Sequence, residues 1–306
     1  MKEMHKNIGV AVLCNHFGIS RQAYYQHEWR LALEVFEGGL LLDEIKSIRE
    51  RHNRIGVRKL HVMLVSFMAE NGIKMGRDGL FDLLSSHGML VRKRKRRVRT
   101  THSFHWLRKY PNLIVDFVPM QPNQLWVCDI TYWKTGKNDF YISLITDAFS
   151  RKIVGYHLSL SLHAEETVKA LKMAVLWLKK GAGANGFERL IHHSDRGVQY
   201  CSSYYTNLLK RNNIDISMTQ SGDPMENAMA ERVNGIIKDE YLLNYKCDTL
   251  EDCAKQLKRA VWLYNNERPH SSIGNFTPEY VNNQYNEIPK DNIKRLWKNY
   301  YTKKSA

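Results

Sequence analysis

The sequence predicts an α/β fold in which helices flank a mixed β-sheet, and two observations carry this prediction. Five stretches rich in aromatic and β-branched residues have the composition of strands: residues 125–133, 140–147, 152–158, 190–193 and 214–218. Only short turn-forming segments join the first three, so these strands are expected to pair as antiparallel neighbours. Apolar residues at helical spacing then separate the remaining strands, and that alternation is typical of helices packed on a mixed sheet.

The stretch Leu125–Trp133 is expected to be the central strand. It has apolar residues at both odd and even positions, which predicts that both of its faces are covered. Asp129 lies in the middle of this stretch, where loss of water destabilises an ionised carboxylate unless a partner compensates. A cation beside the carboxylate would meet this need, and so would a strand end that opens onto a cleft. A loop cap or an arginine pair explains a single aspartate equally well.

Composition limits the classes of protein to consider. The chain has 306 residues, enough for two or three domains, and its 43% hydrophobic content is that of a folded soluble protein. No apolar run approaches the ~20 residues of a membrane span, and the start of the chain lacks the apolar core of a signal peptide. The five cysteines form no CxxC pair, so we expect neither a disulfide framework nor a zinc knuckle, and a reducing cytoplasm fits.

The charge of the chain favours a polyanionic partner, most simply nucleic acid. The formal net charge is +15 and the isoelectric point is near 9.5. One run between residues 92 and 99 is almost entirely basic: Arg92, Lys93, Arg94, Lys95, Arg96, Arg97 and Arg99. A run this dense is expected to contact phosphates independently of base sequence, and a solvated linker is the ordinary alternative.

Helices are predicted in the first 90 residues. Apolar periodicity places them at residues 10–17, 21–29, 41–48, 57–67 and 77–84. The turn before the second helix contains Ser20, which is suited to cap that helix. This is the outline of a helix-turn-helix, with Arg21, Gln22 and Tyr25 able to face DNA, although any helical hairpin has the same outline.

A second acid follows a predicted strand at a place where ligands collect. Asp195 comes just after the strand at residues 190–193, and in α/β sheets ligands bind at the carboxyl ends of strands. His192 and His193 precede it. Because no Cys or His pair at zinc spacing accompanies them, we expect these histidines to pack or hydrogen-bond locally.

A long helix is predicted to begin at Pro224 and to carry a third acid. Asp223 suits its N-cap, and Glu226 completes a capping-box pattern, which gives Glu226 a structural role. Farther along, polar residues at intervals of four, three and four share one helical face: Asn227, Glu231, Asn234 and Lys238. Such a face suits a cleft, although an ordinary solvent-facing surface has the same pattern.

One explanation accounts for Asp129, Asp195 and Glu231 together. Mg²⁺ and Mn²⁺ prefer carboxylate oxygens, and ions held among the three acids would keep Asp129 charged in apolar surroundings. Two ions about 3.5–4 Å apart can activate an attacking hydroxyl group and stabilise the leaving oxygen of a phosphodiester. The three acids therefore favour a metal-dependent phosphoryl-transfer site.

Four segments together resemble a known family. They are residues 126–132 (WVCDITY), 193–200 (HSDRGVQY), 223–231 (DPMENAMAE) and 264–270 (YNNERPH) with Thr277-Pro278. The chain resembles bacterial insertion-sequence transposases of the DDE class, which have a retroviral-integrase-like core. It is most similar to the second-reading-frame product of a family whose transposase is made from two overlapping frames. The separation 231 − 195 = 36 leaves the 35 intervening residues for which this family is known.

The resemblance implies an RNase-H-like fold and an activity, the cleavage and strand transfer of DNA at the ends of an insertion element. Asp129, Asp195 and Glu231 would be the catalytic residues and would bind two Mg²⁺ ions, for which Mn²⁺ can substitute. Water and then a freed 3′-hydroxyl would attack phosphorus in line. Arg268 and His270 match the family motif, but the sequence assigns them no chemistry.

The resemblance also implies partners. DNA contacts are expected from the basic run and from the polar helical face, at Lys238, Asn227 and Asn234. The DNA would be the terminal inverted repeats of the element and the target, held by a homo-oligomer in a synaptic complex. Action with, or fusion to, an upstream reading-frame product stays open. The expected location is the bacterial cytoplasm, at the nucleoid, with no membrane partner.

These expectations define a domain plan. It comprises a short helical segment with a helix-turn-helix outline (1–35), a helical DNA-binding domain with the basic arm (36–99), a linker (100–123), an RNase-H-like catalytic core with a C-terminal helix (124–285) and a basic tail (286–306). The rival acids Asp116, Asp139 and Asp147 are expected at turns or sheet edges. Two alternatives keep the same fold, namely a DNA-binding regulator that has lost catalysis and an RNase-H-type nuclease.

Overall fold

The computed structural model describes residues 8–92, 106–115, 117–135, 138–181, 189–220, 227–243 and 245–287. The basic run beyond Arg92 lies outside the described residues, as do Asp116, the predicted capping pair Asp223 and Glu226, and the tail from residue 288. Within the described ranges, no helix is long and apolar enough to cross a membrane. The chain divides into two compact units, Met1–Arg51 with Gly56–Val91 and His52–Ile55 with Arg92–Ala306.

The described part of the first unit is helical. Its helices are α1 (Val10–His16), α2 (Arg21–Arg51), α3 (Val57–Met63), α4 (Val65–Glu70) and α5 (Arg77–Ser86). Ser20 caps α2 as predicted, since its Oγ accepts a hydrogen bond from Ala23 N at 3.0 Å. Completely buried aliphatic side chains form the core: Leu41, Ile45, Leu60, Leu64, Leu80 and Leu84.

Helix α2 differs from the prediction. The sequence predicted two helices, over residues 21–29 and 41–48, with a domain boundary after residue 35. The structure has a single helix of 31 residues that runs across this boundary. Between the two predicted helices, residues 30–34 are mostly good helix formers and there is no proline, but Gly38 and Gly39 are poor ones. Gly38 is buried, and a Cβ atom there would lie 3.4 Å from Leu83 Cδ1. Close packing against α5 thus keeps α2 helical across Gly38 and Gly39, a glycine pair that by itself weakens a helix.

The second unit contains one five-stranded sheet in the order β3-β2-β1-β4-β5. The strands are β1 (Leu125–Lys134), β2 (Asp139–Asp147), β3 (Ile153–Ser159), β4 (Leu190–Ser194) and β5 (Ile214–Met218). β1 pairs antiparallel with β2, and β2 with β3, whereas the pairs β1–β4 and β4–β5 are parallel. The mixed sheet and the central position of β1 confirm the prediction.

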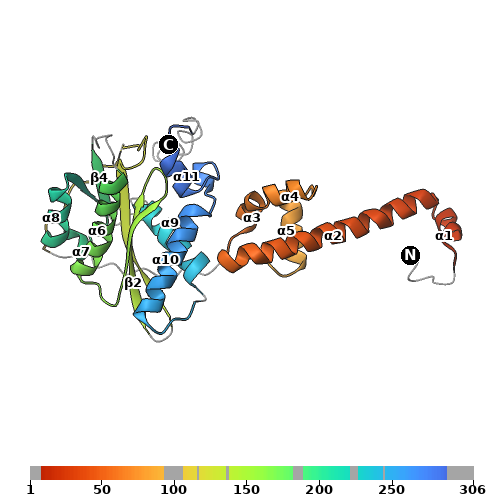
Figure 1. Ribbon diagram of the computed structural model, residues 1–306, viewed down its shortest axis with the longest axis horizontal. Helices are drawn as coiled ribbons and strands as arrows, with labels where there is room; N and C mark the ends of the chain where they lie inside the picture. Colours follow the sequence, from red (N-terminus) through yellow and green to blue (C-terminus); the bar gives the residue numbers. More distant parts are fainter. Residues whose placement is uncertain are drawn as a thin grey trace. The chain divides into compact units, whose positions relative to one another are not determined.

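Helices cover both faces of this sheet (Figure 1). One face is covered by α6 (Ala164–Gly181), α7 (Val198–Cys201) and α8 (Ser203–Arg211), the other by α9 (Ala228–Ile236), the π-helix η2 (Ile237–Leu242) and α10 (Leu250–Asn266). The chain continues through the 3₁₀-helix η3 (Ser271–Ile273) and α11 (Pro278–Asn283). Trp126 and Cys128 of β1 join the core that contains α6, and Leu125 and Val127 join the core that contains residues of α9. Both faces of β1 are therefore buried, as its sequence predicted.

Two cysteines form a disulfide, although the cysteine spacing had predicted no disulfide framework. Cys247 and Cys253 are bonded, and their Cα atoms lie 5.7 Å apart. Cys253 lies near the start of α10, and the segment before that helix brings Cys247 back to it. No CxxC spacing signalled this pair, because six positions separate the two cysteines. Cys14, Cys128 and Cys201 are free and buried.

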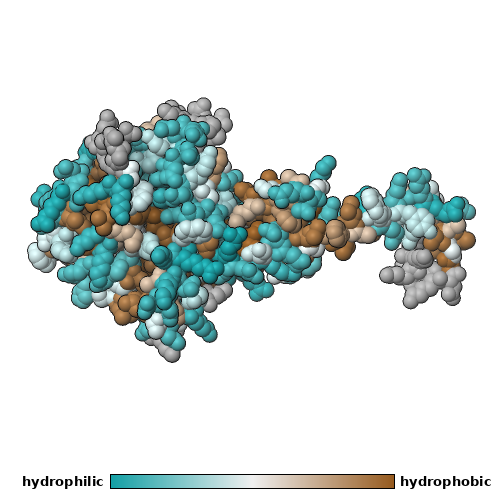
Figure 2. Space-filling model, in the orientation of Figure 1, coloured by the Kyte–Doolittle hydropathy of each residue, from teal (hydrophilic) through white to brown (hydrophobic). Residues whose placement is uncertain are grey.

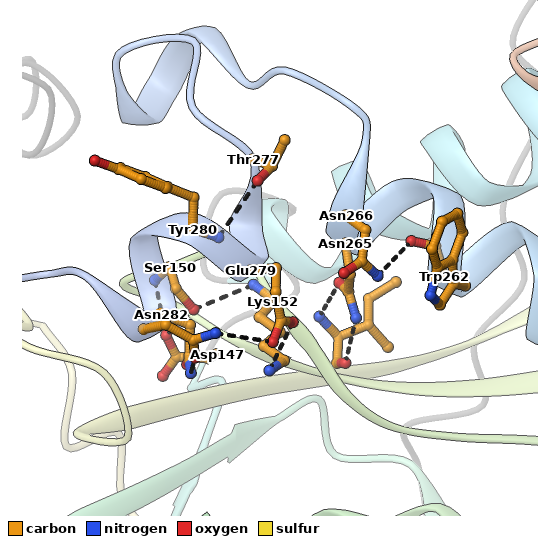
Figure 3. A network of polar contacts seen from close by, with 12 residues as sticks. Asp147, Ser150, Lys152, Trp262, Asn265, Asn266, Thr277, Glu279, Tyr280 and Asn282 are labelled. Carbon is orange, nitrogen blue, oxygen red and sulfur yellow. Dashed lines mark hydrogen bonds and ion pairs between the residues drawn. The ribbon is translucent and has the colours of Figure 1, made fainter.

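The segment around the end of α10 fastens helices to the edge strand β3 (Figure 3). Asn265 Nδ2 donates to Ile153 O at 3.0 Å, and Asn265 Oδ1 accepts from Ile153 N at 2.9 Å. Lys152, just before β3, forms an ion pair of 2.7 Å with Glu279 of α11. These contacts satisfy backbone groups that an edge strand would otherwise leave open to pairing with another chain.

Candidate active site

Asp129 and Asp195 come from two parallel neighbouring strands. Val127 of β1 lies opposite His193 of β4. Asp129 follows Val127 by two residues and Asp195 follows His193 by two, so continuing this register places the two acids side by side. Both carboxylates also act on the same buried group. Burial raises the pKa of the Cys128 thiol, and the charges of Asp195 and Asp129 raise it further. The structure therefore brings two of the three predicted acids together.

Asp129 is the more buried of these two acids, at 8% exposed. Its Oδ1 accepts a hydrogen bond from Ile130 N at 2.9 Å, and its Oδ2 accepts one from Asn234 Nδ2 at 3.0 Å. An amide of α9 thus supplies part of the compensation that a carboxylate needs in apolar surroundings.

Asp195 lies in the turn between β4 and α7 and is half-buried. Its Oδ1 accepts a hydrogen bond from Gly197 N at 3.0 Å. A Cβ atom at position 197 would lie 3.0 Å from that oxygen and 3.1 Å from Gln199 Oε1. Glycine at this position therefore leaves room for the carboxylate, and the turn fixes one of its oxygens at the end of β4.

Helix α9 is hydrogen-bonded to β1 by two amides on the face that carries Glu231. Asn227 Nδ2 donates to Cys128 O at 3.0 Å, and Asn234 Nδ2 donates to Asp129. Residues 227, 231 and 234 share one helical face. Glu231 is half-buried and lies in the first turn of α9, between the two amides that touch residues 128 and 129. This attachment fixes the helical face that carries Glu231 against β1, and the meeting of Glu231 with the other two acids stays a prediction.

The two amides correct part of the sequence prediction. Asn227 and Asn234 were placed among the DNA contacts, but they are only 4% and 3% exposed and their nitrogens are bonded to β1. Helical periodicity shows which residues share a face, but it does not show whether sheet or solvent lies opposite. Lys238, in the first turn of η2, is half-buried, and its DNA contact stays a prediction.

The side chains at this place fit a hard divalent cation. Carboxylate and amide oxygens are the ligands that Mg²⁺ prefers. Asn234 Oδ1 is a buried acceptor with no hydrogen-bond partner among the described residues, and it belongs to the side chain that touches Asp129. Among the described residues, no three His, Cys, Asp or Glu side chains lie together so that they could hold a metal ion, and the convergence of Asp129, Asp195 and Glu231 on one ion pair therefore stays a prediction. Asp129 and Asp195 are oriented by protein donors.

His192 and His193 have local partners, as predicted. His193 Nδ1 lies 2.8 Å from Ser217 Oγ, and His192 Nε2 lies 3.0 Å from Tyr205 OH. Both histidines are buried, and burial, with a contribution from His193, lowers the pKa of His192 to about 3. His192 is therefore a neutral member of the core at physiological pH.

Two rival acids have the structural roles expected of them. Asp139, at the start of β2, is exposed and forms an ion pair of 3.1 Å with Lys134. Asp147, at the end of β2, is fully buried, and its Oδ1 accepts hydrogen bonds from Ser150 N and Ser150 Oγ at 2.7 and 2.6 Å. Burial raises the pKa of Asp147, whereas the hydrogen bonds from Ser150 oppose that rise.

Arg268 and His270, which had no predicted role, belong to a buried polar cluster. Arg268 is 1% exposed and makes a two-pronged ion pair with Glu240 of η2, with Nε–Oε2 and Nη2–Oε1 distances of 2.7 Å. The Nε2 atom of His270 lies 3.1 Å from Arg268 Nη1. This cluster holds the π-helical turn that continues α9. Nothing in the sequence pointed to the pair, because 28 positions separate Arg268 from Glu240.

Comparisons with known proteins agree with this architecture. Residues 119–224 match the integrase core domain family, and residues 212–278 match a second family of the same description. The chain is 34% identical over 281 residues to the insertion element IS600 uncharacterized 31 kDa protein of Shigella sonnei, covering 90% of this chain and 99% of that protein. It is 29% identical over 294 residues to the transposase for insertion sequence element IS629 of Shigella sonnei, covering 93% of this chain and 95% of the other.

Among solved structures, the chain is similar to the HTLV-2 integrase catalytic core domain in complex with magnesium. The identity is 23% and the TM-score 0.41, over 53% of this chain and 97% of that chain. The sheet, its helices and the matched segments define the class, an integrase core domain with an RNase-H-like fold. The chain belongs to the bacterial insertion-sequence transposases of the DDE class, and it is an enzyme of that family.

Proposed function

We propose that this transposase cleaves and joins DNA strands at the ends of its element, with two divalent ions held by Asp129, Asp195 and Glu231. The observation that carries the proposal is the parallel pairing of β1 and β4, which ends at Val127 and His193, each two residues before one of the acids. The hydrogen bonds of Asn227 and Asn234 add to it, because they fasten the face of α9 that carries Glu231 to the same part of β1.

The residues around the acids orient them for this work. Ile130 N and Asn234 Nδ2 hold the two oxygens of Asp129, and Gly197 N holds one oxygen of Asp195. Bound Mg²⁺ or Mn²⁺ ions would lower the barrier to in-line attack on phosphorus by water or a 3′-hydroxyl and would stabilise the leaving oxygen. Lys238, seven residues after Glu231, is the residue that we assign to a DNA phosphate near the reacting strand.

The substrate that we propose is duplex DNA, namely the terminal inverted repeats of the element and the target. A net charge of +15 supports binding to a polyanion. The basic run from Arg92 to Arg99 would add contacts that are independent of base sequence, and the helical unit before it would bind the element ends. A homo-oligomer would hold the two ends together, and cooperation with an upstream reading-frame product belongs to the same proposal.

The test uses three carboxylate-to-amide variants: Asp129→Asn, Asp195→Asn and Glu231→Gln. Each keeps the shape of the side chain and removes its charge, so each should abolish Mg²⁺-dependent cleavage of element ends while DNA binding stays close to that of the wild type. Asp139→Asn is the matched control, because Asp139 is an acid of the same sheet paired at the surface with Lys134. Normal cleavage by any one of the three variants would remove that residue from the proposed site.

The same assay separates the alternatives. A DNA-binding regulator would bind the element ends and cleave nothing, even with Mg²⁺ or Mn²⁺ present. An RNase-H-type nuclease would hydrolyse generic RNA–DNA hybrids and would join no 3′-hydroxyl to a target strand. Strand-transfer products that depend on the terminal sequence are the result expected of the transposase.

A further inference from the structure

Helix α2 carries apolar residues on two nearly opposite sides. On a helical projection of about 100° per residue, the buried side chains of Leu41, Ile45 and Ile48 lie roughly 150° away from Tyr25, Trp29 and Phe36. The first set packs in the core of the helical unit. The second set lies on the other side of the same helix, so the helices that cover the first set do not cover it.

The second side is open to solvent over four turns of α2. From residue 21 to residue 36 every residue is exposed except Tyr24, which is half-buried. The exposed fractions are 58% for Tyr25, 71% for Trp29 and 64% for Phe36. Figure 2 shows hydrophobic residues over the middle of this helix, on a scale that colours phenylalanine and leucine brown but tyrosine and tryptophan pale. Large aromatic side chains in such a row mark an interaction surface when they form a contiguous patch.

The spacing within this row indicates the kind of partner. Tyr25, Trp29, Ala32 and Phe36 follow one another at intervals of four, three and four, the spacing of the core positions in a coiled coil. Leu33, 39% exposed, flanks the row. We call Tyr25, Trp29, Ala32 and Phe36 the α2 stripe. We propose that this stripe forms an antiparallel helix pair with the α2 stripe of a second copy of this chain.

The antiparallel arrangement pairs the largest side chain of the stripe with the smallest. When the two copies are related by a two-fold axis, Trp29 of one copy faces Ala32 of the other, and Tyr25 faces Phe36. A large ring then meets the smallest apolar side chain of the stripe. The two-fold axis makes each of these two kinds of layer occur twice, so the dimer has four layers.

Charge complementarity favours the same arrangement. Residues 21–37 contain Arg21 and Arg30 against Glu28, Glu34 and Glu37, a formal charge of 2 − 3 = −1. The basic residue Arg21 begins the segment and Glu37 ends it, so antiparallel copies bring opposite charges towards each other. In a chain of net charge +15, the slightly acidic segment 21–37 around the stripe is a poor surface for DNA but allows two copies to approach without strong repulsion. Tyr25, which the sequence also allowed to face DNA, is thereby assigned to the partner copy.

The area available suits a dimer that forms reversibly as the protein concentration is raised. Aromatic side chains bury about 150–250 Å² each, and a specific interface buries about 800 Å² per partner. The three aromatic side chains of each copy are 58–71% exposed, so together with Leu33 they can bury roughly half of that area, which is the size of a transient interface.

The test compares the mass of the full chain in solution, without DNA or metal, as the protein concentration is raised. The wild type should pass from 35.9 kDa to twice that mass. The double variant Trp29→Glu/Phe36→Glu should raise the dissociation constant by about 100-fold or more, because hot-spot residues of this kind dominate interfaces. Leu31→Glu is the matched control, since Leu31 is 42% exposed on the other side of α2, and it should leave the dimer intact.

A second pair of variants tests the layers. Ala32→Trp should weaken the dimer, because it places a second indole in the layer in which Trp29 now faces only the methyl group of Ala32. Adding Trp29→Ala should restore the dimer by exchanging the two members of that layer. A wild type that stays monomeric, or a dimer equally weakened by Leu31→Glu, would overturn the proposal. A dimer that the double glutamate variant leaves unchanged would do the same. Because neither DNA nor metal is present, these results are independent of the proposed reaction.

Discussion

Strand β1 and helix α2 have the same kind of sequence and opposite surroundings. Each carries apolar residues on two sides, β1 at odd and even positions and α2 on nearly opposite helical faces. Helices of the same unit cover both faces of β1, so its residues from Leu125 to Asp129 are all buried. Only one side of α2 is covered within the helical unit, and residues 21–36 stay almost entirely exposed. A two-sided apolar pattern therefore predicts that partners exist, but it does not say whether they belong to the same molecule.

The sharpest test of this comparison replaces one tryptophan in each element. Trp126 of β1 is completely buried, so Trp126→Ala should lower the free energy of unfolding by about 3–5 kcal/mol through lost burial and a cavity. Trp29 of α2 is 71% exposed, so Trp29→Ala should change the free energy of unfolding by less than about 0.5 kcal/mol when the protein is dilute. Denaturant unfolding followed by circular dichroism at low protein concentration measures both. A large loss from Trp29→Ala in dilute protein would mean that the chain itself covers the stripe.

The ion pairs of the two units differ in the same way. Arg268 is 1% exposed and Glu240 only 17%, so Arg268→Met should cost about 3–5 kcal/mol by leaving a carboxylate buried without its partner. Arg30 and Glu34 of α2 are 65% and 63% exposed at 3.9 Å, and Arg30→Met should give no measurable change. The unfolding midpoint in guanidinium chloride measures both variants. The double variant Arg268→Met/Glu240→Leu should recover stability, because it also removes the unpaired carboxylate. If the double variant is no more stable than Arg268→Met, the loss does not come from the ion pair.

Much of the catalytic unit could be predicted from the sequence because its signals are local or familiar. The five strands follow from β-branched and aromatic runs, and the acids follow from a motif at fixed spacing. The contacts that orient those acids could not be predicted. The hydrogen bond from Asn234 to Asp129 joins residues 105 positions apart, whereas the shared polar face, together with the family resemblance, had predicted that Asn234 contacts DNA.

In the helical unit, the sequence-based prediction failed because tertiary contacts overrode local preferences. Apolar periodicity predicted two short helices, over residues 21–29 and 41–48, where α2 is continuous. Tertiary contact overrode that local preference, because Gly38 packs against Leu83, a residue 45 positions away by 83 − 38. The disulfide between Cys247 and Cys253 was also missed, since a spacing of six residues is no signal without the fold that closes it.

A glycine in the sheet marks how closely a helix covers it. A Cβ atom at Gly155 of β3 would lie 2.4 Å from Ala170 O and 2.9 Å from Ala174 Cβ, both in α6. Gly155→Ala should therefore force the helix and strand apart and cost about 1–3 kcal/mol in the free energy of unfolding. Thermal unfolding measures the loss. An unchanged free energy of unfolding would show that α6 can move away from the sheet without destabilising the fold.

The buried His192 should make the catalytic unit sensitive to acid. Burial lowers its pKa from 6.5 to about 3, so below pH 6.5 the unfolded chain takes up a proton that the folded chain refuses. Stability from this residue is thus present above pH 6.5 and is lost as the pH falls, by about 2 kcal/mol between pH 7 and pH 5. His192→Gln should flatten the dependence of the unfolding free energy on pH over that range. An equally steep profile in the variant would assign the acid sensitivity to other groups.

The smallest effect is expected on the exposed side of α2, where there is room to add an atom. Nothing lies within 4 Å of a Cβ atom built on Gly39, and the residue is exposed within the helix. Gly39→Ala should therefore stabilise the helical unit by about 0.5–1 kcal/mol, because alanine loses less backbone freedom on folding. Gly38→Ala is the matched control, since its Cβ atom would meet Leu83 at 3.4 Å and part of the gain should be lost. Amide hydrogen exchange along α2, measured in dilute protein, would report both changes. Equal gains at the two positions would mean that α5 packs on α2 more loosely than β3 packs on α6.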